Sequence, residues 1–299
     1  MRIRRPMKHP EKYPAGTETR KAVCKVNLNL EIVGLHEDGY HELSSLFYPL
    51  NEPADVMVIS EGQPGSGLKI QCGTPGLDGE SNTMIKAWRL YAEETGFSPG
   101  LCVELTKHIP IGAGLGGGSS DAAVILGYLN ARAGDASLSD AGLTALAAKV
   151  GADVPFFLYK EPAWATGIGE ILSPADIDLS GFFGVLACPP VSVSTSWAYG
   201  AWDKEFALKL QDSLTWRRSD IKKMNFSGAW LRNDFEAVVF RKYPEVRIIK
   251  EFFLAHGASG SVMSGSGSSV FSLFRERPQA EEASERLRER GVAVYMQEL

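Results

Sequence analysis

Residues 110–123 of the chain read PIGAGLGGGSSDAA and run directly into the apolar segment VILGYLN. Five glycines fall at positions 112, 114, 116, 117 and 118, so few Cβ atoms keep a ligand away from the backbone amides. The segment that follows is helical in pattern, and the first N–H groups of a helix are unpaired and lie at the positive end of its dipole. Ser119, Ser120 and Asp121 suit the cap and first turn of that helix. The stretch therefore predicts an anion site, and a polyphosphate is its natural occupant.

Other glycine-rich phosphate loops fit this stretch less well. A Walker A loop has a lysine directly after its glycines, and none stands here. Residues 112–117 do match the dinucleotide fingerprint G-x-G-x-x-G, but that fingerprint opens a βαβ unit, whereas here a helical pattern continues where the second strand should be. A Rossmann dehydrogenase thus remains the alternative from another class. A protein kinase is excluded because the chain has no H-R-D or D-F-G segment.

Strand and helix patterns follow one another along the chain without a βαβ rhythm, which predicts an α+β fold rather than a doubly wound sheet. In the first half, strand patterns cover 22–34, 44–50, 54–60, 68–72 and 101–109, and helix patterns cover 82–96, 122–134 and 139–150. In the second half, strand patterns cover 182–190, 260–274 (split by glycines) and 292–297, and helix patterns cover about 204–212, 245–255 and 278–291.

Length and composition favour two packed domains, which we place at 1–165 and 166–299, with residues 1–20 as a loose extension. The net charge of −5 gives no reason to expect nucleic acid or an anionic membrane as a partner, although a basic arm that binds RNA is a second interpretation of residues 1–20. No apolar run is long enough for a membrane span or a secretory signal. The four cysteines are widely spaced, so we expect reduced thiols and a cytoplasmic protein without a metal-binding cysteine motif. No protein partner is inferred.

Further sequence blocks extend the pattern of the glycine loop. They are AVCKVNLNL at 22–30, DGYHEL at 38–43, GADVPFF at 151–157, GIGE at 167–170, NDFE at 233–236 and SGSGSS at 264–269. Together with the loop, this ordered set resembles the motifs of the GHMP kinase superfamily over residues 22 to 274. The chain departs from the family pattern at Val23 and Cys24, where the family has Pro-Ala, and at Glu161 and Pro162, where it usually has glycines.

The resemblance implies a two-domain fold, with a ribosomal-protein-S5-like N-terminal domain and a ferredoxin-like C-terminal domain, and an enzyme that moves the γ-phosphoryl group of ATP to an alcohol. It implies that Asp153 accepts the hydroxyl proton and that Lys25 keeps this carboxylate ionised and offsets charge on the phosphoryl group. Mg²⁺ should accompany ATP, with Ser119 or Ser120 as the hydroxyl that reaches it. The residues expected at ATP are Asn82, Lys86, Lys107, Pro110, Ile111, Gly112, Ala113, Gly114, Leu115, Gly116, Gly117, Gly118, Ser119 and Ser120.

The three consecutive glycines followed by SSDAA are similar to the branch of the family that phosphorylates the 2-hydroxyl of cytidine diphosphate methylerythritol, on the non-mevalonate route to isoprenoids. The resemblance implies that one aromatic residue from each half sandwiches the cytosine and that a histidine hydrogen-bonds its edge. The residues expected at this substrate are Asn27, Tyr40, His41, Thr195 and Tyr199.

Without the resemblance, each candidate also has a simpler interpretation. Asp153 could cap a turn, and Lys25 could be an edge lysine whose ammonium reaches water. Residues 264–269 have the composition of a second backbone approach to ligand phosphates, but they could also be a hairpin or bulge loop. The aromatic residues could belong to the core. Two functional alternatives also remain: a GHMP kinase for another alcohol, such as homoserine or mevalonate, and a catalytically silent nucleotide-binding relative. The DGYH block argues against the first, and the intact Lys25 and Asp153 argue against the second.

Overall fold

Two long antiparallel strands, β1 (Glu18–Leu35) and β2 (His41–Glu61), form the centre of the first half. The computed structural model describes residues 16–210 and 230–299. The first sheet has the strand order β3-β4-β2-β1-β8, and β5 and β6 join it through β2. Its shorter strands are β3 (Leu68–Cys72), β4 (Leu101–Thr106), β5 (Ala163–Thr166), β6 (Ile171–Pro174) and β8 (Arg232–Asn233).

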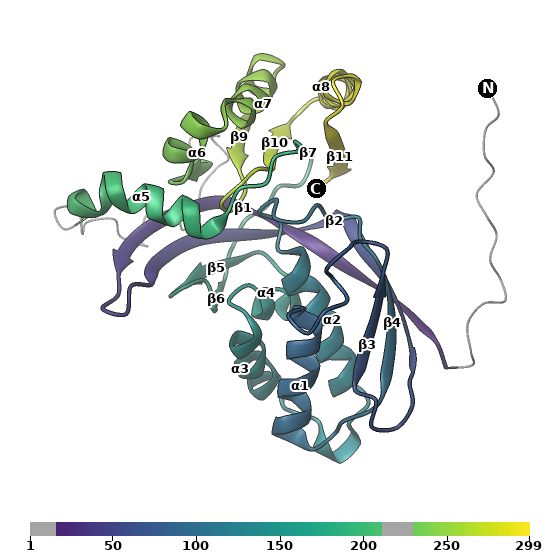
Figure 1. Ribbon diagram of the computed structural model, residues 1–299. Coiled ribbons are helices and arrows are strands. Elements are labelled where there is room, and N and C mark those ends of the chain that lie inside the picture. The colour runs from purple at the N-terminus through teal and green to yellow at the C-terminus, as the bar shows by residue number, and fades with distance from the viewer. Residues whose placement is uncertain (1–15, 211–229) are drawn as a thin grey trace, which may run out of the picture.

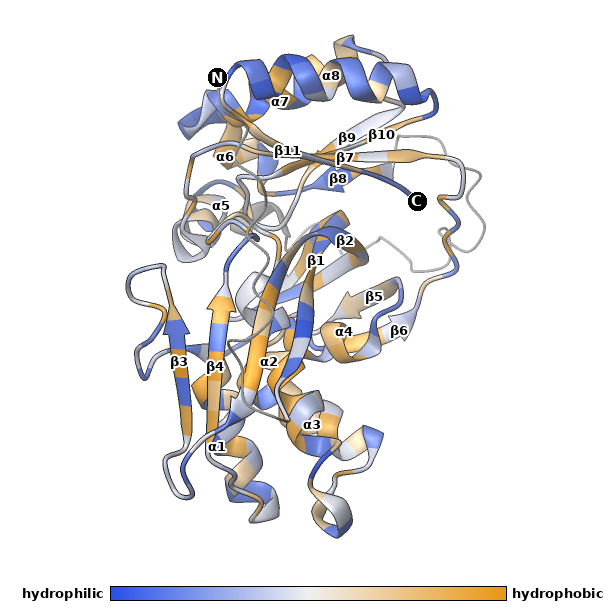
Figure 2. Cartoon of the chain, turned by 90° about the vertical axis from the view of Figure 1, so that its right-hand side faces the viewer, coloured by the Kyte–Doolittle hydropathy of each residue, from blue (hydrophilic) through white to orange (hydrophobic). Residues whose placement is uncertain are grey.

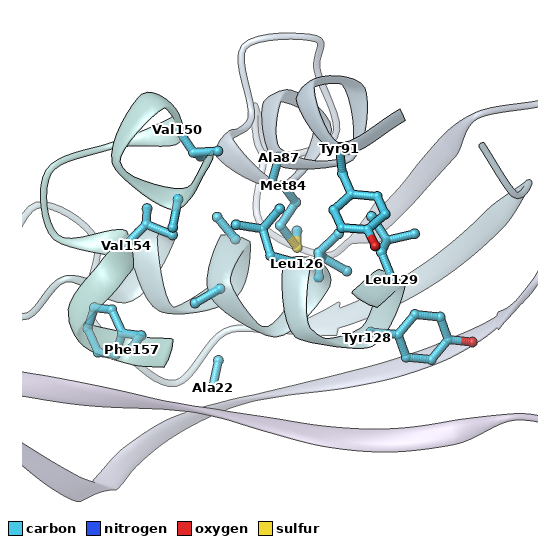
Figure 3. Packing of buried hydrophobic residues seen from close by; sticks show 14 of the residues in the cluster. Ala22, Met84, Ala87, Tyr91, Leu126, Tyr128, Leu129, Val150, Val154 and Phe157 are labelled. Carbon is cyan, nitrogen blue, oxygen red and sulfur yellow. The ribbon is translucent and has the colours of Figure 1, made fainter. Parts of the chain in front are cut away.

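Four helices cover one face of this sheet (Figure 1). They are α1 (Thr83–Thr95), α2 (Gly117–Asn130), α3 (Asp140–Val150) and α4 (Val154–Tyr159), with a short 3₁₀ turn at Gly134–Ala136. Figure 3 shows their contact layer, in which Met84 and Tyr91 of α1 meet Leu126 of α2, and Val154 of α4 lies close by. This core fixes α2, and with it the glycine loop, against the strands.

The second half is built on a four-stranded antiparallel sheet with the order β11-β7-β10-β9. These strands are β7 (Phe183–Cys188), β9 (Gly260–Met263), β10 (Val270–Phe274) and β11 (Ala293–Glu298), and the helices are α5 (Thr195–Leu210), α6 (Glu236–Lys242), α7 (Pro244–Ala255) and α8 (Arg277–Glu289). Helices α7 and α8 cover its outer face (Figure 2). Along the chain, helices lie between β7 and β9 and between β10 and β11, whereas β9 and β10 follow each other directly. This βαββαβ order is that of a ferredoxin-like domain.

The inner face of the second sheet packs on the first sheet. Val26 and Leu28 of β1 belong to the same buried cluster as Val262, Phe271 and Leu273 of β9 and β10. Strand β8 also pairs with β1 in parallel, with Asn29 opposite Arg232. Strand β1 therefore contributes to the packing of both halves.

The predicted α+β class is confirmed, and each predicted element has a counterpart. Helix α2 spans Gly117–Asn130 rather than 122–134, and the short elements α4, α6, β5, β6 and β8 were not predicted. Three other differences have a physical reason. The segments 44–50 and 54–60 belong to one strand, β2, because a register shift beside Val23 and Cys24 lets Asn51–Pro53 bulge out. Helix α5 begins at Thr195, nine residues before the predicted 204, and the end of the predicted segment (211–212) lies outside the described residues.

The third difference concerns the extension predicted for residues 1–20. Strand β1 already includes Glu18–Arg20, and Arg20 and Arg132 both pair with Glu18, whereas residues 1–15 lie outside the described part. All four cysteines are free thiols, as predicted. No helix within 16–210 or 230–299 is long and apolar enough to cross a membrane.

Candidate active site

The glycine loop leads into α2 through three residues with left-handed backbone, Gly112, Gly114 and Gly116, whose φ angles are 67°, 79° and 71°. Gly116 is the N-cap and makes no side-chain hydrogen bond, so α2 begins at Gly117 within the glycine run. Neither Ser119 nor Ser120 caps the helix, which corrects the predicted position of the cap. The N-cap and the first two residues of α2 are therefore glycines, so no Cβ atom covers these amides from their own residues, as a phosphate site requires.

A second loop, Ser264–Ser269 between β9 and β10, supports the glycine loop from the other half. The Ser264 hydroxyl donates to the Gly114 carbonyl at 2.8 Å, and the Ser269 amide donates to the Ala113 carbonyl at 3.2 Å. A Cβ atom on Gly114 would lie 2.0 Å from the Ser264 carbonyl oxygen. The segment is therefore a hairpin loop, as one interpretation of the sequence had it, and it fixes the position of the glycine loop.

Lys25 of β1 lies beside Asp153, the residue before α4. Lys25 Nζ lies 3.5 Å from Asp153 Oδ2 and donates to Asn27 Oδ1 at 2.6 Å. The lysine side chain is buried, and its ammonium lies over the Phe47 ring at 4.7 Å from the centroid, while the Asp153 side chain keeps 31% of its surface exposed. Asp153 precedes α4 but makes no capping hydrogen bond. This geometry does not support the interpretations of Asp153 as a cap or of Lys25 as a water-exposed edge residue.

Beneath the glycine loop, Lys107 is bound between two buried carboxylates. Its ammonium pairs with Asp55 and lies 2.8 Å from Asp121 Oδ2. Asp55 also accepts the amides of His108 and Ile109, at 2.6 and 2.8 Å. Burial raises the pKa of Asp121 to about 7, against the opposing effect of the Lys107 charge. Lys107 still lines the cleft, so its charge lies behind the glycine amides.

The residues expected at ATP are not all brought to one surface. Asn82 lines the cleft and caps α1 by accepting the Met84 amide at 2.9 Å. Lys86 does not line the cleft, and its ammonium donates to the Val150 carbonyl at 2.9 Å. Ser120 is buried and does not line the cleft either, whereas Ser119 does. The rest of the loop, from 110 to 119, lines the cleft throughout.

The residues expected at the base lie at the end of the cleft formed by β2 and α5. The His41 and Tyr199 rings are stacked with centroids 4.5 Å apart, and Phe235 contacts Tyr199 edge-on. Tyr40 lies at the rim with 59% of its surface exposed. The Thr195 hydroxyl is hydrogen-bonded to that of Ser266 at 2.8 Å. Burial raises the pKa of Tyr199 to about 12, so its phenol keeps its proton near neutral pH.

One cleft of about 990 Å³ contains both ends of this site. Its walls come from both halves of the chain, and they include Gly265 and Ser266 of the 264–269 loop. They also include residues that the sequence interpretation did not name as site residues: Asp121, Asp203 and Phe235. Asp203 could have been found, because it follows Thr195 and Tyr199 at intervals of four residues on α5. The predicted start of that helix, at 204, concealed this spacing.

A glycine loop that leads into a helix, beside a lysine–carboxylate pair, is an arrangement suited to a nucleotide-dependent phosphotransferase. Two family descriptions match the chain: "GHMP kinases N terminal domain" at residues 82–161 and "GHMP kinases C terminal" at residues 217–293. The chain belongs to the GHMP kinase family. Kinases of this family take ATP as co-substrate.

The chain is similar over most of its length to proteins that carry one enzyme name. It is 48% identical to the 4-diphosphocytidyl-2-C-methyl-D-erythritol kinase of Nitratidesulfovibrio vulgaris over 93% of this chain and 97% of the relative. A crystal structure of 4-(cytidine 5'-diphospho)-2C-methyl-D-erythritol kinase is 36% identical, with a TM-score of 0.73, and covers 93% of this chain and 98% of its own. The homoserine kinase of Cytophaga hutchinsonii, 18% identical with a TM-score of 0.71 and 96% coverage of both chains, shares the fold.

Proposed function

We propose that the protein transfers the γ-phosphoryl group of ATP to the 2-hydroxyl of 4-diphosphocytidyl-2-C-methyl-D-erythritol, on the non-mevalonate route to isoprenoid precursors. The observation that carries the proposal is the Lys25–Asp153 pair, 3.5 Å apart, in the same cleft as the glycine loop. The substrate is supported by the names of the relatives that match almost the whole chain.

The chain's own residues account for the chemistry of this step. The acceptor oxygen forms a bond to the γ-phosphorus, the bond from that phosphorus to the β–γ bridging oxygen breaks, and ADP leaves. Asp153 accepts the proton of the hydroxyl as the new bond forms. Lys25 offsets the negative charge on the transferred group, and its buried position makes that effect stronger than it would be in water. The amides at the start of α2 bind the other phosphates.

Mg²⁺ fits the phosphate end of the cleft. A magnesium ion bound to a nucleotide needs only one or two protein oxygens, because phosphates and water supply the rest. Ser119 lines the cleft in the first turn of α2, so of the two predicted serines it is the one placed to supply an oxygen. When bound, the ion supplies positive charge to the phosphate oxygens.

The base end of the proposal uses Tyr40, His41 and Tyr199, with Asn27 and Thr195 nearer the acceptor alcohol. All five line the cleft. The division of the chain at 165/166 and a cytoplasmic location remain predictions.

ADP release measured over a panel of alcohols tests the proposal. The panel contains the cytidylated methylerythritol, homoserine and mevalonate, and each reaction is run with the wild type and with Asp153→Asn. We expect turnover only with the cytidylated alcohol, lowered by ~10²–10⁴ in the variant because the general base is lost. Turnover of homoserine or mevalonate instead would contradict the assigned substrate. Near-normal turnover by Asp153→Asn would contradict the role of the base.

A further inference from the structure

The imidazole ring of His41 is held from three sides. Its Nε2 atom lies 2.6 Å from Oδ1 of Asp203 on α5. One face stacks on Tyr199, and Trp202 meets the ring with its plane nearly perpendicular, at 87° and 6.1 Å between centroids. His41 itself is buried, with 8% of its surface exposed, at the start of β2. Because α5 supplies all three contacts, the ring has one orientation relative to that helix.

The contact with Asp203 also selects the tautomer of His41. A carboxylate can only accept a hydrogen bond, so Nε2 must carry the proton. In the neutral ring Nδ1 then has a lone pair and acts as an acceptor. Within the described residues, 16–210 and 230–299, the His41 ring makes one hydrogen bond, the one to Asp203. The Nδ1 acceptor is therefore left for a ligand, and His41 lines the cleft.

Cytosine and uracil differ at the group such an acceptor would meet. Position 4 of cytosine carries an amino group, which donates, whereas position 4 of uracil carries a carbonyl oxygen, which accepts. A lone pair on Nδ1 can accept from the first and repels the second.

We propose that Asp203 is a positioning residue that fixes the tautomer of His41 and so makes the base end of the cleft select cytosine over uracil. The inference rests on the proposed function, since a cytidylated acceptor is what brings a base to His41. Asp203 acts through His41 and needs no contact with the substrate. The selection arises from one proton position, because both bases have the same ring size and stack equally on an aromatic residue.

A purely structural role for Asp203 would be to tie α5 to β2. That role predicts a loss of stability, or a loss of substrate affinity that is equal for both bases. The proposal predicts a change in the preference between the bases, so the ratio of kcat/KM for the cytidine and uridine diphosphate esters of methylerythritol distinguishes the two roles.

The experiment compares the wild type with Asp203→Leu, Asp203→Asn and the control Glu205→Gln. Leucine removes the acceptor at similar volume, whereas asparagine keeps an oxygen that can accept from Nε2. Glu205 lies on the same helix, pairs with Arg241 and is outside the cleft, so its variant removes one charge without touching His41. Asp203 keeps 38% of its side-chain surface exposed, so its replacement should leave the fold intact, which circular dichroism checks.

We expect Asp203→Leu to lower the cytosine-to-uracil ratio of kcat/KM by about tenfold or more. This is the effect expected when one base forms a hydrogen bond and the other leaves the same buried acceptor unpaired. The change should lie in the KM for the acceptor, with kcat and the KM for ATP little altered. Asp203→Asn should restore most of the ratio, and Glu205→Gln should leave it unchanged. Nitrogen-15 NMR of the ligand-free wild type, recorded at an alkaline pH where imidazole is uncharged, should show the His41 proton at Nε2. Asp203→Leu should lose that single tautomer.

A ratio unchanged in Asp203→Leu overturns the proposal, and so does an uncharged wild-type His41 that carries its proton at Nδ1. If the wild type phosphorylates neither nucleotide ester, the proposed function is wrong and the base preference falls with it. The NMR result is independent of the substrate, so the two failures are distinguishable.

Discussion

Replacing Gly114 by alanine puts a methyl group where the two loops of the active site meet. The new Cβ would lie 2.0 Å from the Ser264 carbonyl oxygen and 2.9 Å from its carbon. Both are backbone atoms, so a rotamer change cannot relieve the overlap. The glycine loop and the 264–269 loop would have to separate by about 1.4 Å or more to reach an ordinary contact distance.

The cost of this separation has two parts. An L-residue at a φ of 79° costs ~1–2 kcal/mol relative to glycine. Moving the loops apart also weakens the hydrogen bonds from Ser264 to Gly114 and from Ser269 to Ala113, each worth ~1 kcal/mol. The variant should therefore lose roughly 2–4 kcal/mol of unfolding free energy. Because the displaced amides belong to the proposed phosphate site, nucleotide affinity should fall by about tenfold or more, since lost or distorted hydrogen bonds cost ~1–3 kcal/mol.

Chemical denaturation measures the first quantity, and calorimetric titration with a non-hydrolysable ATP analogue measures the second. Gly127→Ala is the matched control, since a Cβ there meets nothing within 4 Å and the residue lies in the interior of the same helix, α2. It should gain ~0.5–1 kcal/mol and bind nucleotide normally. If Gly114→Ala were as stable as the wild type and bound the analogue equally well, the proposed support of one loop by the other would be refuted.

Three further substitutions test other parts of the site. The pKa of Asp121 is raised to about 7 by burial, so between about pH 4 and 7 the folded protein holds a proton that the unfolded chain releases; stability should fall as pH rises, by up to ~1.4 kcal/mol per unit from this group. Asp121→Asn should lose that slope in a denaturation series, and a slope that persists would assign it elsewhere. Lys25→Met should lower single-turnover rates by ~10²–10³ while nucleotide binding is retained, and an unaltered rate would show that its charge is not used. Tyr199→Ala should raise the KM for the cytidylated alcohol by roughly tenfold or more with little change in the KM for ATP; an unaltered value would mean that Tyr199 does not stack on the base.

Local patterns predicted the parts of the protein that depend on local chemistry. The glycine run and the helix pattern after it predicted a glycine loop that leads into a helix, as α2 shows, and the glycine at 96 closes α1 as expected. The motif resemblance named Lys25 and Asp153, which the fold brings together from 128 positions apart.

The parts that were missed depend on contacts between distant segments. Nothing near Asp55 in the sequence indicates that it will bind Lys107, 52 residues later, or accept a hydrogen bond from the backbone amide of His108, just before the glycine loop. Asn51–Pro53 resembles a strand break, and only the pairing with β1 shows that the strand continues past it. The first turns of α5 have no clear apolar stripe, because residues such as Thr195 and Tyr199 line the cleft. The helical pattern is therefore recognisable only from 204 onward.

The packing of β1 against both sheets limits how the family can be recombined. An exchange of whole C-terminal halves between two such kinases would look like a simple way to change the acceptor alcohol. Here the exchanged half would have to fit the side chains of Val26 and Leu28 and keep the pairing of β8 with β1. It would also have to keep the close backbone contact between Gly114 and Ser264. A mismatch at any of them would reach the phosphate loop. If the base end lies where we propose, a few substitutions on α5 and at the start of β2 should alter acceptor preference with less damage to the fold than an exchange of halves.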